Sequence, residues 1–277
     1  MQSFSVLMSV YKKDNPSYLQ EAIESISCNQ TVQPSEVVIV IDGPIPIGLE
    51  SVIHRIETKI QYIRTIWLSE NKGLGNALRI GLLECRYEIV MRMDSDDISL
   101  PTRFEKHLKF MESHPDIDIC SAQISEFVED ENNVIGKRII PCGHKEITHL
   151  LKFRCPINHM CVCALRDSIL KSGNYQDWYF NEDYYLWVRM YIEGCKFANL
   201  PDVLVNVRVG KEMYARRGGW SYFKSEAKLQ CYMIKHHVTN LLQFLFNVIV
   251  RFVVQIMMPN QLRAYVFKRL LRKSISV

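Results

Sequence analysis

The sequence predicts an α/β fold built on a doubly wound, mostly parallel sheet. Short apolar runs without polar alternation recur along the chain, as is typical of strands buried on both faces. Segments with helical spacing of apolar residues alternate with these runs, and acidic or amide residues follow where the runs end. The 277 residues are 48% hydrophobic and 23% charged, which suits a globular protein with a sizeable core.

The first unit comprises a predicted strand at residues 4–10, a helix at 16–27 and a second strand at 37–41. Asn15 is a good N-cap for this helix because Pro16 occupies the first helical position. Two strands joined by one helix over so short a stretch predict a right-handed, parallel βαβ unit.

The same alternation continues along the chain. The next predicted elements are a helix at 48–59, a strand at 62–68, a glycine-containing turn at 71–75 that opens a third helix, and a strand that ends at Asp94. Further on we expect a helix that opens near Pro101, a strand or two at 117–128, a polar hairpin region at 129–141, an apolar run at 160–165 and a closing strand at 203–208.

Three carboxylates directly follow the fourth predicted strand, at Asp94, Asp96 and Asp97. In open α/β sheets, ligands bind at the C-terminal ends of the strands. Asp94 and Asp96 are two positions apart in extended chain, so their side chains point to the same side. Together they can share one divalent cation with a diphosphate, because hard cations prefer oxygen ligands. A solvated acidic turn is the alternative interpretation.

Polar groups also follow the other strands. Asp42 ends the second strand, where it either accepts hydrogen bonds from a base or ribose or stabilises an Asp-Gly turn. Asn71 and Gly73 precede the third helix, whose N-terminus either approaches a diphosphate through backbone N–H groups or is a plain helix start. Arg79, in the early turns of that helix, faces a phosphate or solvent. Because the carboxyl ends of parallel strands share one edge, we expect these groups in a single crevice.

A second acidic pair, Glu182 and Asp183, lies at the N-terminal end of a predicted helix. The helix dipole favours negative charge at this end, which is a purely structural reason for both residues. In the functional interpretation, one carboxylate is the general base that takes the proton of an acceptor hydroxyl. A metal-binding cluster that is separate from a base fits direct displacement without a covalent intermediate.

Two further segments hold candidate residues. Asn158 and His159 precede the apolar run at 160–165, and the ordinary interpretation of such a histidine is structural. Arg208 ends the closing strand, and Arg216 lies in the basic segment that follows it. That segment is either a loop that folds over a diphosphate or an ordinary solvated loop.

The sequence predicts a domain at residues 1–235, followed by an amphipathic, basic tail at residues 236–277. Polar residues recur every four positions on an otherwise apolar helix, at Gln243, Asn247, Arg251 and Gln255. A helix with such a stripe is a poor transmembrane span. From residue 261 onward the chain has no acidic residue and has cations at Arg263, Lys268, Arg269, Arg272 and Lys273. We therefore predict a peripheral membrane anchor, with packing of this helix on the domain as the alternative.

The overall charge and the cysteines indicate the compartment. The net charge of +4 is mild, and no stripe of basic and aromatic residues predicts a nucleic-acid partner. The nine cysteines are scattered without a Cys-x-x-Cys pattern, and the first residues lack the charged start and cleavage site of a signal peptide. Reduced thiols without an export signal predict a cytoplasmic protein.

Four stretches of the first hundred residues resemble, in order and spacing, the nucleotide-sugar glycosyltransferases of the GT-A fold, family 2 type. Residues 5–11 resemble the opening strand of that family, and residues 38–43 resemble its Val-Asp-Asp-Gly strand end, with Ile41 in place of the first Asp. Residues 71–81 resemble its Asn-x-Gly helix start, and residues 93–97 resemble its metal-binding Asp-x-Asp. This resemblance implies a GT-A sheet with a nucleotide-sugar-binding half at residues 1–98 and an acceptor-binding half at 99–235.

The resemblance also implies the donor site. A uridine nucleotide would lie near Tyr11 and Asp42, with Mn²⁺ or Mg²⁺ between the donor diphosphate and the carboxylates of Asp94 and Asp96. The other donor-side candidates within the matched stretches are Asn71, Gly73, Arg79 and Ser95. Arg208 and Arg216 are diphosphate-loop candidates because of their place next to and in the basic segment, independently of the resemblance.

The acceptor side resembles the same family. Residues 182–189 resemble its Glu-Asp-x-x-Leu-Trp-x-Arg motif, in which the residue that matches Asp183 is the general base. By the same resemblance Glu182 holds an acceptor hydroxyl, and Trp187 of this motif is an acceptor candidate. Residues 155–159 are similar to a segment of amylovoran-type and O-antigen sugar transferases, which makes Asn158 and His159 further acceptor candidates.

The activity implied is that of an inverting, metal-dependent hexosyltransferase of bacterial O-antigen or capsule repeat-unit synthesis. It would transfer galactose or glucose from a UDP-sugar to GlcNAc or GalNAc on an undecaprenyl-type polyprenyl diphosphate, in β-1,3 linkage, at the cytoplasmic face of the inner membrane. The Gln-x-x-Arg-Trp motif of processive synthases is absent, which indicates a non-processive enzyme.

Two alternatives belong to other classes. A nucleotidyltransferase shares the sheet and the metal, but it would need a Gly-rich basic loop where this chain has residues 11–16. A non-enzymatic, membrane-associated nucleotide-binding protein would not need Asp94, Asp96 and Asp183 together.

Overall fold

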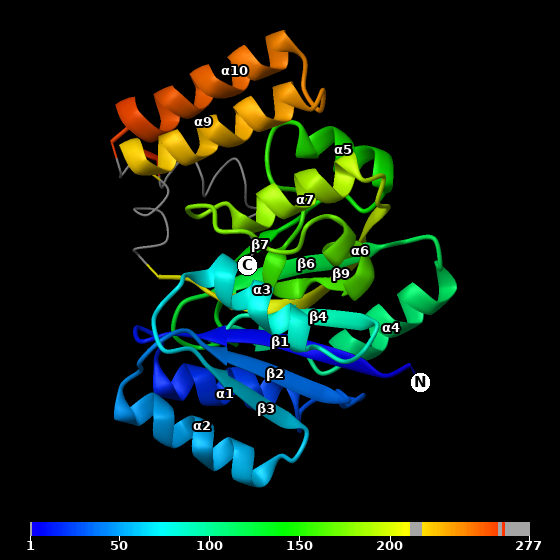
Figure 1. Cartoon of the computed structure of the whole chain (residues 1–277), viewed down its shortest axis with the longest axis vertical. Coiled ribbons are helices and arrows are strands. Elements are labelled where there is room, and N and C mark those ends of the chain that lie inside the picture. Colours follow the sequence, from blue (N-terminus) through cyan, green and yellow to red (C-terminus); the bar gives the residue numbers. More distant parts are fainter. Residues whose placement is uncertain (1, 211–217, 260–261, 264–277) are drawn as a thin grey trace.

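The computed structural model describes residues 2–210, 218–259 and 262–263. The first half of the chain alternates strands and helices as predicted (Figure 1). These elements are β1 (Phe4–Val10), α1 (Pro16–Ile26), β2 (Glu36–Ile41), α2 (Ile47–Lys59), β3 (Ile63–Trp67), α3 (Leu74–Glu84) and β4 (Ile89–Met93). β1, β2 and β4 are buried along nearly their whole length, which explains why their sequences lack polar alternation.

Helices cover both faces of this part of the sheet. Leu19 of α1 and Ile53 of α2 join Val6 of β1 in one hydrophobic core. Leu78 of α3 packs with Leu7 of β1 in a second core on the opposite face. Neighbouring residues of β1 therefore serve different helix layers, as the alternation of side chains along a strand requires.

The second half adds strands that are both shorter and longer than those of the first half, together with further helices. Its elements are β5 (Ile98–Ser99), α4 (Arg103–Ser113), β6 (Ile119–Phe127), β7 (Val134–Arg138), α5 (His144–Leu151), the 3₁₀ turn η1 (His159–Cys161), β8 (Cys163–Leu165), α6 (Arg166–Lys171), α7 (Glu182–Ile192) and β9 (Phe197–Arg208). β6 occupies the segment predicted as a strand or two at 117–128, and it pairs antiparallel with β7, which lies in the polar hairpin region predicted at 129–141. The apolar run at 160–165 is a strand only from Cys163 onward, because η1 occupies its beginning.

All nine strands of the described residues belong to one sheet in the order β3-β2-β1-β4-β8-β6-β9-β5, with β7 beside β6. β3, β2, β1 and β4 are parallel to one another. Beyond β4 the sheet is mixed, because β8 runs antiparallel to both β4 and β6 while β9 runs parallel to β6. The doubly wound parallel half is thus continued directly by a mixed half within the same sheet.

A pair of helices lies at one end of the molecule (Figure 1). α9 (Trp220–Lys235) and α10 (Leu241–Phe252) pack against each other, and the π-helical turn η2 (Val253–Met257) extends α10. α10 begins with a capping box, in which the side chains of Asn240 and Gln243 each accept a hydrogen bond from the backbone N of the other. The boundary predicted after residue 235 falls in the turn between α9 and α10. Within the described ranges, no helix has the length and apolar character needed to cross a membrane.

Candidate active site

A cavity of about 620 Å³ opens beyond the C-terminal end of β4. Its lining comes from both halves of the sheet and from the start of α9. The lining residues are Tyr18, Asp94, Asp96, Asp97, Val128, Glu129, Met160, Phe180, Val207, Arg208, Val209, Gly210 and Tyr222. The acidic triplet therefore meets Arg208, more than a hundred residues away in the sequence, at the edge of the sheet where a ligand is expected.

The three carboxylates have different environments. Asp94 is partly exposed and forms an ion pair with Arg92 of β4. Asp97 is buried, and its Oδ1 accepts a hydrogen bond from the backbone N of Arg208 at 2.9 Å. Asp96 is exposed to the cavity, and its backbone carbonyl accepts from Nε of Arg208 at 3.1 Å. Asp97 thus joins the end of β4 to the end of β9, whereas Asp94 and Asp96 present oxygen atoms to the cavity.

A fourth carboxylate, Asp14, belongs to the same group, and the sequence prediction missed it. Its Oδ2 accepts hydrogen bonds from Oγ of Ser95 at 2.8 Å and from the backbone N of Tyr11 at 3.0 Å. Burial raises the pKa of Asp14 to about 6, and the charge of Asp94 adds to that rise. The available signal was its position just past the first strand, the same position that singled out Asp42 and Asp94.

The carboxylates of this site repel one another. Asp96 lies in a recess of the protein, and this partial removal from bulk water, together with the charges of Asp94 and Asp14, raises its pKa to about 6. Burial, followed by the charges of Asp96 and Asp94, raises the pKa of Asp97 well above the usual value. The site therefore holds more negative charge than its own cations balance.

This donor set fits a hard divalent cation. Carboxylate oxygens are the ligands that Mg²⁺ and Mn²⁺ prefer, and a bound cation would relieve the repulsion that raises the pKa values. Among the described residues, no three or more His, Cys, Asp or Glu side chains form a complete metal site. A cation held by Asp94 and Asp96 would take its remaining ligands from a diphosphate and water.

Asp42, Asn71 and Gly73 meet one another at the start of α3. The two carboxylate oxygens of Asp42 accept hydrogen bonds from the backbone N of Lys72 at 2.7 Å and of Gly73 at 3.0 Å. Nδ2 of Asn71 donates to the carbonyl of Asp42 at 3.0 Å. A Cβ at Gly43, whose φ is +84°, would lie 2.4 Å from the N of Asn71, so this close turn requires glycine.

The turn after β2 is therefore fixed to the start of α3, and Asp42 uses both oxygens to fix it. Tyr11 is 36% exposed, and Arg79 is exposed on α3. Of the predicted donor-side residues that the structure describes, those outside the triplet and Arg208 do not line the cavity described above. Their contact with a nucleotide stays a prediction.

Glu182 and Asp183 form the first turn of α7, as predicted. Burial raises the pKa of Glu182 to about 8, and the adjacent Asp183 charge contributes to the rise. Oδ2 of Asp183 lies 3.8 Å from Sγ of Cys155, which donates to it. The charges of Arg92 and Asp94 both act on Glu182. The second acidic pair therefore lies within electrostatic range of the triplet, although it does not line the same cavity.

Arg92 connects the two acidic groups, and the sequence prediction missed it because it lies inside an apolar strand. Its side chain is 3% exposed and forms an ion pair with Asp94. Within the described residues, its Nε and Nη1 have no hydrogen-bond partner. Its positive charge lowers the pKa of Asp96, Asp97 and Glu182, against the larger effect of burial. A charged residue in a buried strand, two positions before the triplet, was the signal that could have identified it.

The three acceptor candidates lie in the packed layer between η1 and α7. Asn158 is fully buried, and its Nδ2 donates to the carbonyl of Ala122 at 2.7 Å. Nε2 of His159 lies 3.1 Å from the hydroxyl of Tyr175, and burial lowers the pKa of His159 well below its usual value. Trp187 is 0% exposed and meets the His159 ring edge-on. Asn158 and Trp187 are thus fully buried in this structure, and their contact with an acceptor stays a prediction.

Arg208, predicted to bind a diphosphate, lies in the cavity wall. Its guanidinium stacks over the rings of Tyr18, 3.8 Å from the centroid, and Phe127, at 4.6 Å. Its Nη2 pairs with Glu21 at 2.6 Å. Its charge is therefore held beside the carboxylates of the triplet, where a diphosphate would also lie. Arg216, the other candidate of this group, lies outside the described residues.

Comparison of the sequence with known proteins gives several similarities. The model of the family described as "Glycosyl transferase family 2" matches residues 5–173. The amylovoran biosynthesis glycosyltransferase AmsE of Erwinia amylovora is 41% identical over 82% of this chain and 84% of its own. A protein of Escherichia coli named UDP-Gal:alpha-D-GlcNAc-diphosphoundecaprenol beta-1,3-galactosyltransferase is 39% identical over 98% of this chain and 97% of its own. An uncharacterized glycosyltransferase of Haemophilus influenzae is 41% identical over 98% and 99%.

Solved structures confirm the predicted GT-A fold. S. aureus TarS in complex with UDP-GlcNAc superposes with a TM-score of 0.67 at 14% sequence identity, over 97% of this chain and 76% of its own. The mannosyltransferase PcManGT from Pyrobaculum calidifontis, in complex with GDP-Man and Mn²⁺, gives a TM-score of 0.64 at 15% identity, over 96% and 78%. At these identities the similarity is one of fold.

Proposed function

This chain belongs to glycosyl transferase family 2, and from that premise we propose that it transfers one hexose from a UDP-sugar to a lipid-linked sugar. The hexose is galactose or glucose, and the acceptor is GlcNAc or GalNAc on a polyprenyl diphosphate such as undecaprenyl diphosphate. The relative from Escherichia coli, named for such a reaction and 39% identical over almost the whole of both chains, supports this substrate class. The same name supports a β-1,3 linkage. Another relative from Escherichia coli, named an O-antigen biosynthesis glycosyltransferase and 28% identical over 89% of this chain, supports a place in O-antigen or capsule repeat-unit synthesis.

The observation that carries the proposal is the presence of two acidic groups that are both subject to the charge of Arg92. The triplet lines a cavity at the end of β4, where a donor diphosphate would bind. Glu182 and Asp183 lie apart from it at the start of α7, yet within its electrostatic field. An enzyme that transfers a sugar directly needs both a site for the leaving diphosphate and a separate base.

The proposed reaction is a single displacement. Asp183 accepts the proton of the acceptor hydroxyl while that oxygen forms a bond to the anomeric carbon. The bond between this carbon and the UDP oxygen breaks, UDP leaves with the electron pair, and the configuration at the carbon inverts. Glu182, protonated at neutral pH because its pKa is about 8, donates a hydrogen bond to the acceptor. Mn²⁺ or Mg²⁺ on Asp94 and Asp96 would neutralise the charge of the diphosphate.

Because the proposed acceptor is attached to a lipid, the transfer reaction would take place at a membrane surface. We propose peripheral association with the cytoplasmic face of the inner membrane. The unpaired state of all nine cysteines is compatible with a reducing compartment.

The test is a transfer assay with purified full-length protein, Mn²⁺, a panel of UDP-, GDP- and dTDP-sugars, and a GlcNAc- or GalNAc-diphosphate-lipid. We expect transfer from one UDP-hexose, a β-linkage in the product by NMR, and loss of turnover when EDTA removes the metal. Asp183→Asn should lower kcat by about 100-fold or more while UDP-sugar binding is kept.

Asp167→Asn is the matched control, because the Asp167 side chain is 75% exposed on α6. It should leave kcat unchanged. Full activity of Asp183→Asn would refute the role of Asp183 as base, and failure to bind any nucleotide sugar would refute the donor class.

A further inference from the structure

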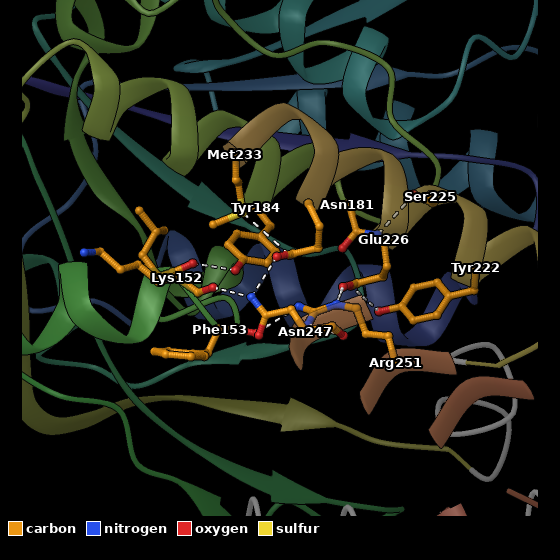
Figure 2. A network of polar contacts seen from close by, with 12 residues as sticks. Lys152, Phe153, Asn181, Tyr184, Tyr222, Ser225, Glu226, Met233, Asn247 and Arg251 are labelled. Atoms are coloured by element: carbon orange, nitrogen blue, oxygen red, sulfur yellow. Dashed lines mark hydrogen bonds and ion pairs between the residues drawn. The ribbon is translucent and has the colours of Figure 1, made fainter. Parts of the chain in front are cut away.

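In α10 the polar side of the helix is buried and the apolar side is exposed, the reverse of an ordinary surface helix. Of its twelve residues, the buried one is the amide Asn247. Its Nδ2 donates to the carbonyl of Lys152 at 2.7 Å and to Oε1 of Gln230 at 2.8 Å (Figure 2). A helix on a protein surface ordinarily turns its apolar residues inward. Here the polar side faces the domain.

Two more residues of the polar stripe are directed the same way. Arg251 pairs with the buried Glu226 of α9, and its Nη2 donates to the carbonyl of Phe153 at 2.8 Å (Figure 2). Gln255 in η2 is 8% exposed, and its carbonyl accepts from the N of Gly219 at 3.0 Å. The stripe predicted from sequence thus fixes the helix to the domain, and the apolar side is left facing outward.

The outward side is a broad apolar surface. Six of its residues are exposed by between 42 and 78%, namely Leu241, Leu242, Phe246, Ile249, Val253 and Met257. We call these six residues the outer face of α10. Exposed apolar area of this extent on one helix is unfavourable in water and marks a site of interaction.

The charges of the surrounding chain indicate which partner covers the outer face. Glu226, which is paired with Arg251, is the last acidic residue of the sequence. The final fourteen residues contain only basic charges, at Lys268, Arg269, Arg272 and Lys273. An apolar helix face followed by uncompensated positive charge is complementary to a bilayer with anionic headgroups. A protein partner would have no comparable need for this charge excess.

Exposed aromatic residues connect the outer face with the active-site cavity. Trp220, 58% exposed at the start of α9, contacts the ring of Phe252 of α10 at 6.1 Å between centroids. Tyr222, two residues further on, lines the cavity and contacts Phe180 at 6.4 Å. Phe180 is 48% exposed. Aromatic rings of this kind favour the interface between water and acyl chains, so the cavity would open near the depth of lipid headgroups.

From these observations we propose that the outer face of α10 docks on an anionic lipid bilayer and holds the active-site cavity at the headgroup layer. The proposal rests on the proposed function in one respect, since a lipid-linked acceptor explains why the cavity would need that position. The docking itself depends only on the helix surface and its charge.

The test is co-sedimentation of the full-length protein with vesicles of phosphatidylcholine, alone or mixed with phosphatidylglycerol. We expect binding to the mixed vesicles that weakens as salt is added. The double variant Phe246→Glu/Ile249→Glu should bind at least about tenfold less, because it places charge where acyl chains would lie. Both residues are exposed by about 60%, at 59 and 61%, so the fold should be kept.

The matched control is Leu83→Glu/Ile135→Glu, which changes two exposed apolar residues on α3 and β7. It should bind vesicles like the unchanged protein. Equal binding by the Phe246→Glu/Ile249→Glu variant would overturn the proposal. So would a dimer in size-exclusion chromatography that this variant dissociates, without any vesicle binding, since a second copy would then cover the outer face.

A parallel assay separates this inference from the proposed function. On a short-chain, water-soluble acceptor, the Phe246→Glu/Ile249→Glu variant should turn over like the unchanged protein. Vesicle binding without transfer from any donor would contradict the proposed function and leave the docking in place. Transfer in solution by a protein that binds no vesicles would contradict the docking alone.

Discussion

At the scale of single residues, Arg92 is a cation whose charge acts on both acidic groups of the site. It is a buried cation that forms an ion pair with Asp94, and its field reaches both acidic groups. A buried charge without full hydrogen bonding is costly unless a ligand or a charged transition state interacts with it. Its Nε and Nη1 have no hydrogen-bond partner among the described residues, and in the proposed reaction the diphosphate or the transferred sugar would complete its hydrogen bonding.

A single substitution at Glu182 tests whether this residue acts as a protonated, neutral acid. Because its pKa is about 8, it is a neutral acid at pH 7, and Gln reproduces its shape and its ability to donate. We predict that Glu182→Gln keeps kcat/KM at pH 7 within about threefold, in contrast to Asp183→Asn. As the pH rises above about 8, deprotonation of Glu182 places a second negative charge beside Asp183 and removes the donor, so kcat/KM of the unchanged enzyme should fall.

The measurement is kcat/KM from about pH 6 to pH 9.5 for both proteins, with the same donor and acceptor. The alkaline decrease should be absent in Glu182→Gln. An equally large loss of activity in Glu182→Gln and Asp183→Asn at pH 7 would show that Glu182 acts as a carboxylate.

At the scale of elements, the attachment of α10 to α9 depends on a buried ion pair. The side chains of Arg251 and Glu226 are 11 and 9% exposed. Removal of one partner from such a pair leaves an uncompensated charge, whereas removal of both is much less costly. We predict that Arg251→Met lowers the free energy of unfolding by about 3–5 kcal/mol, measured by urea denaturation.

The double variant Arg251→Met/Glu226→Gln should recover most of this loss, because no buried charge is then left unpaired. Glu226→Gln alone completes the double-mutant cycle and gives the coupling energy of the pair. If the double variant were as unstable as Arg251→Met, the loss would come from the contact of Arg251 with Phe153 and from packing.

At the scale of the whole molecule, strands of the two halves pair with one another in a single sheet. β8 of the second half inserts beside β4 of the first, and β5, at the boundary between the halves, pairs with β9. Neither half can keep its sheet edges satisfied without the other. We therefore predict one cooperative unfolding transition for residues 1–235, with no intermediate in which one half stays folded.

The variant Trp67→Phe makes this measurable. Trp67 lies in β3 and is 43% exposed, and the three remaining tryptophans all lie in the second half and α9. Fluorescence of this variant then reports on the second half, while far-UV circular dichroism reports on both. The two denaturation curves should coincide, and a separation between their midpoints would show that the halves unfold independently.

The sequence alone was sufficient for the features that depend on neighbours along the chain. Asn15 caps α1 by accepting from the N of Ser17 at 2.9 Å, the apolar runs are buried strands, and the acidic triplet follows β4. Periodicity and capping are local, because they record which side of an element is buried and where its backbone groups lack partners. The same local motifs also predicted the fold and the enzyme class correctly.

Only the tertiary structure decided the features that join residues far apart in the chain. The polar stripe of α10 was visible in the sequence, but its direction depends on Asn247 meeting the carbonyl of Lys152, 95 residues away. Arg92 and Asp14 join the site through Asp94 and Ser95, and no pattern within one strand or loop records such a partner. A sequence pattern gives the two faces of a helix or strand, whereas the burial of one face or the other is set by the free energy of contacts that form only when the whole chain has folded.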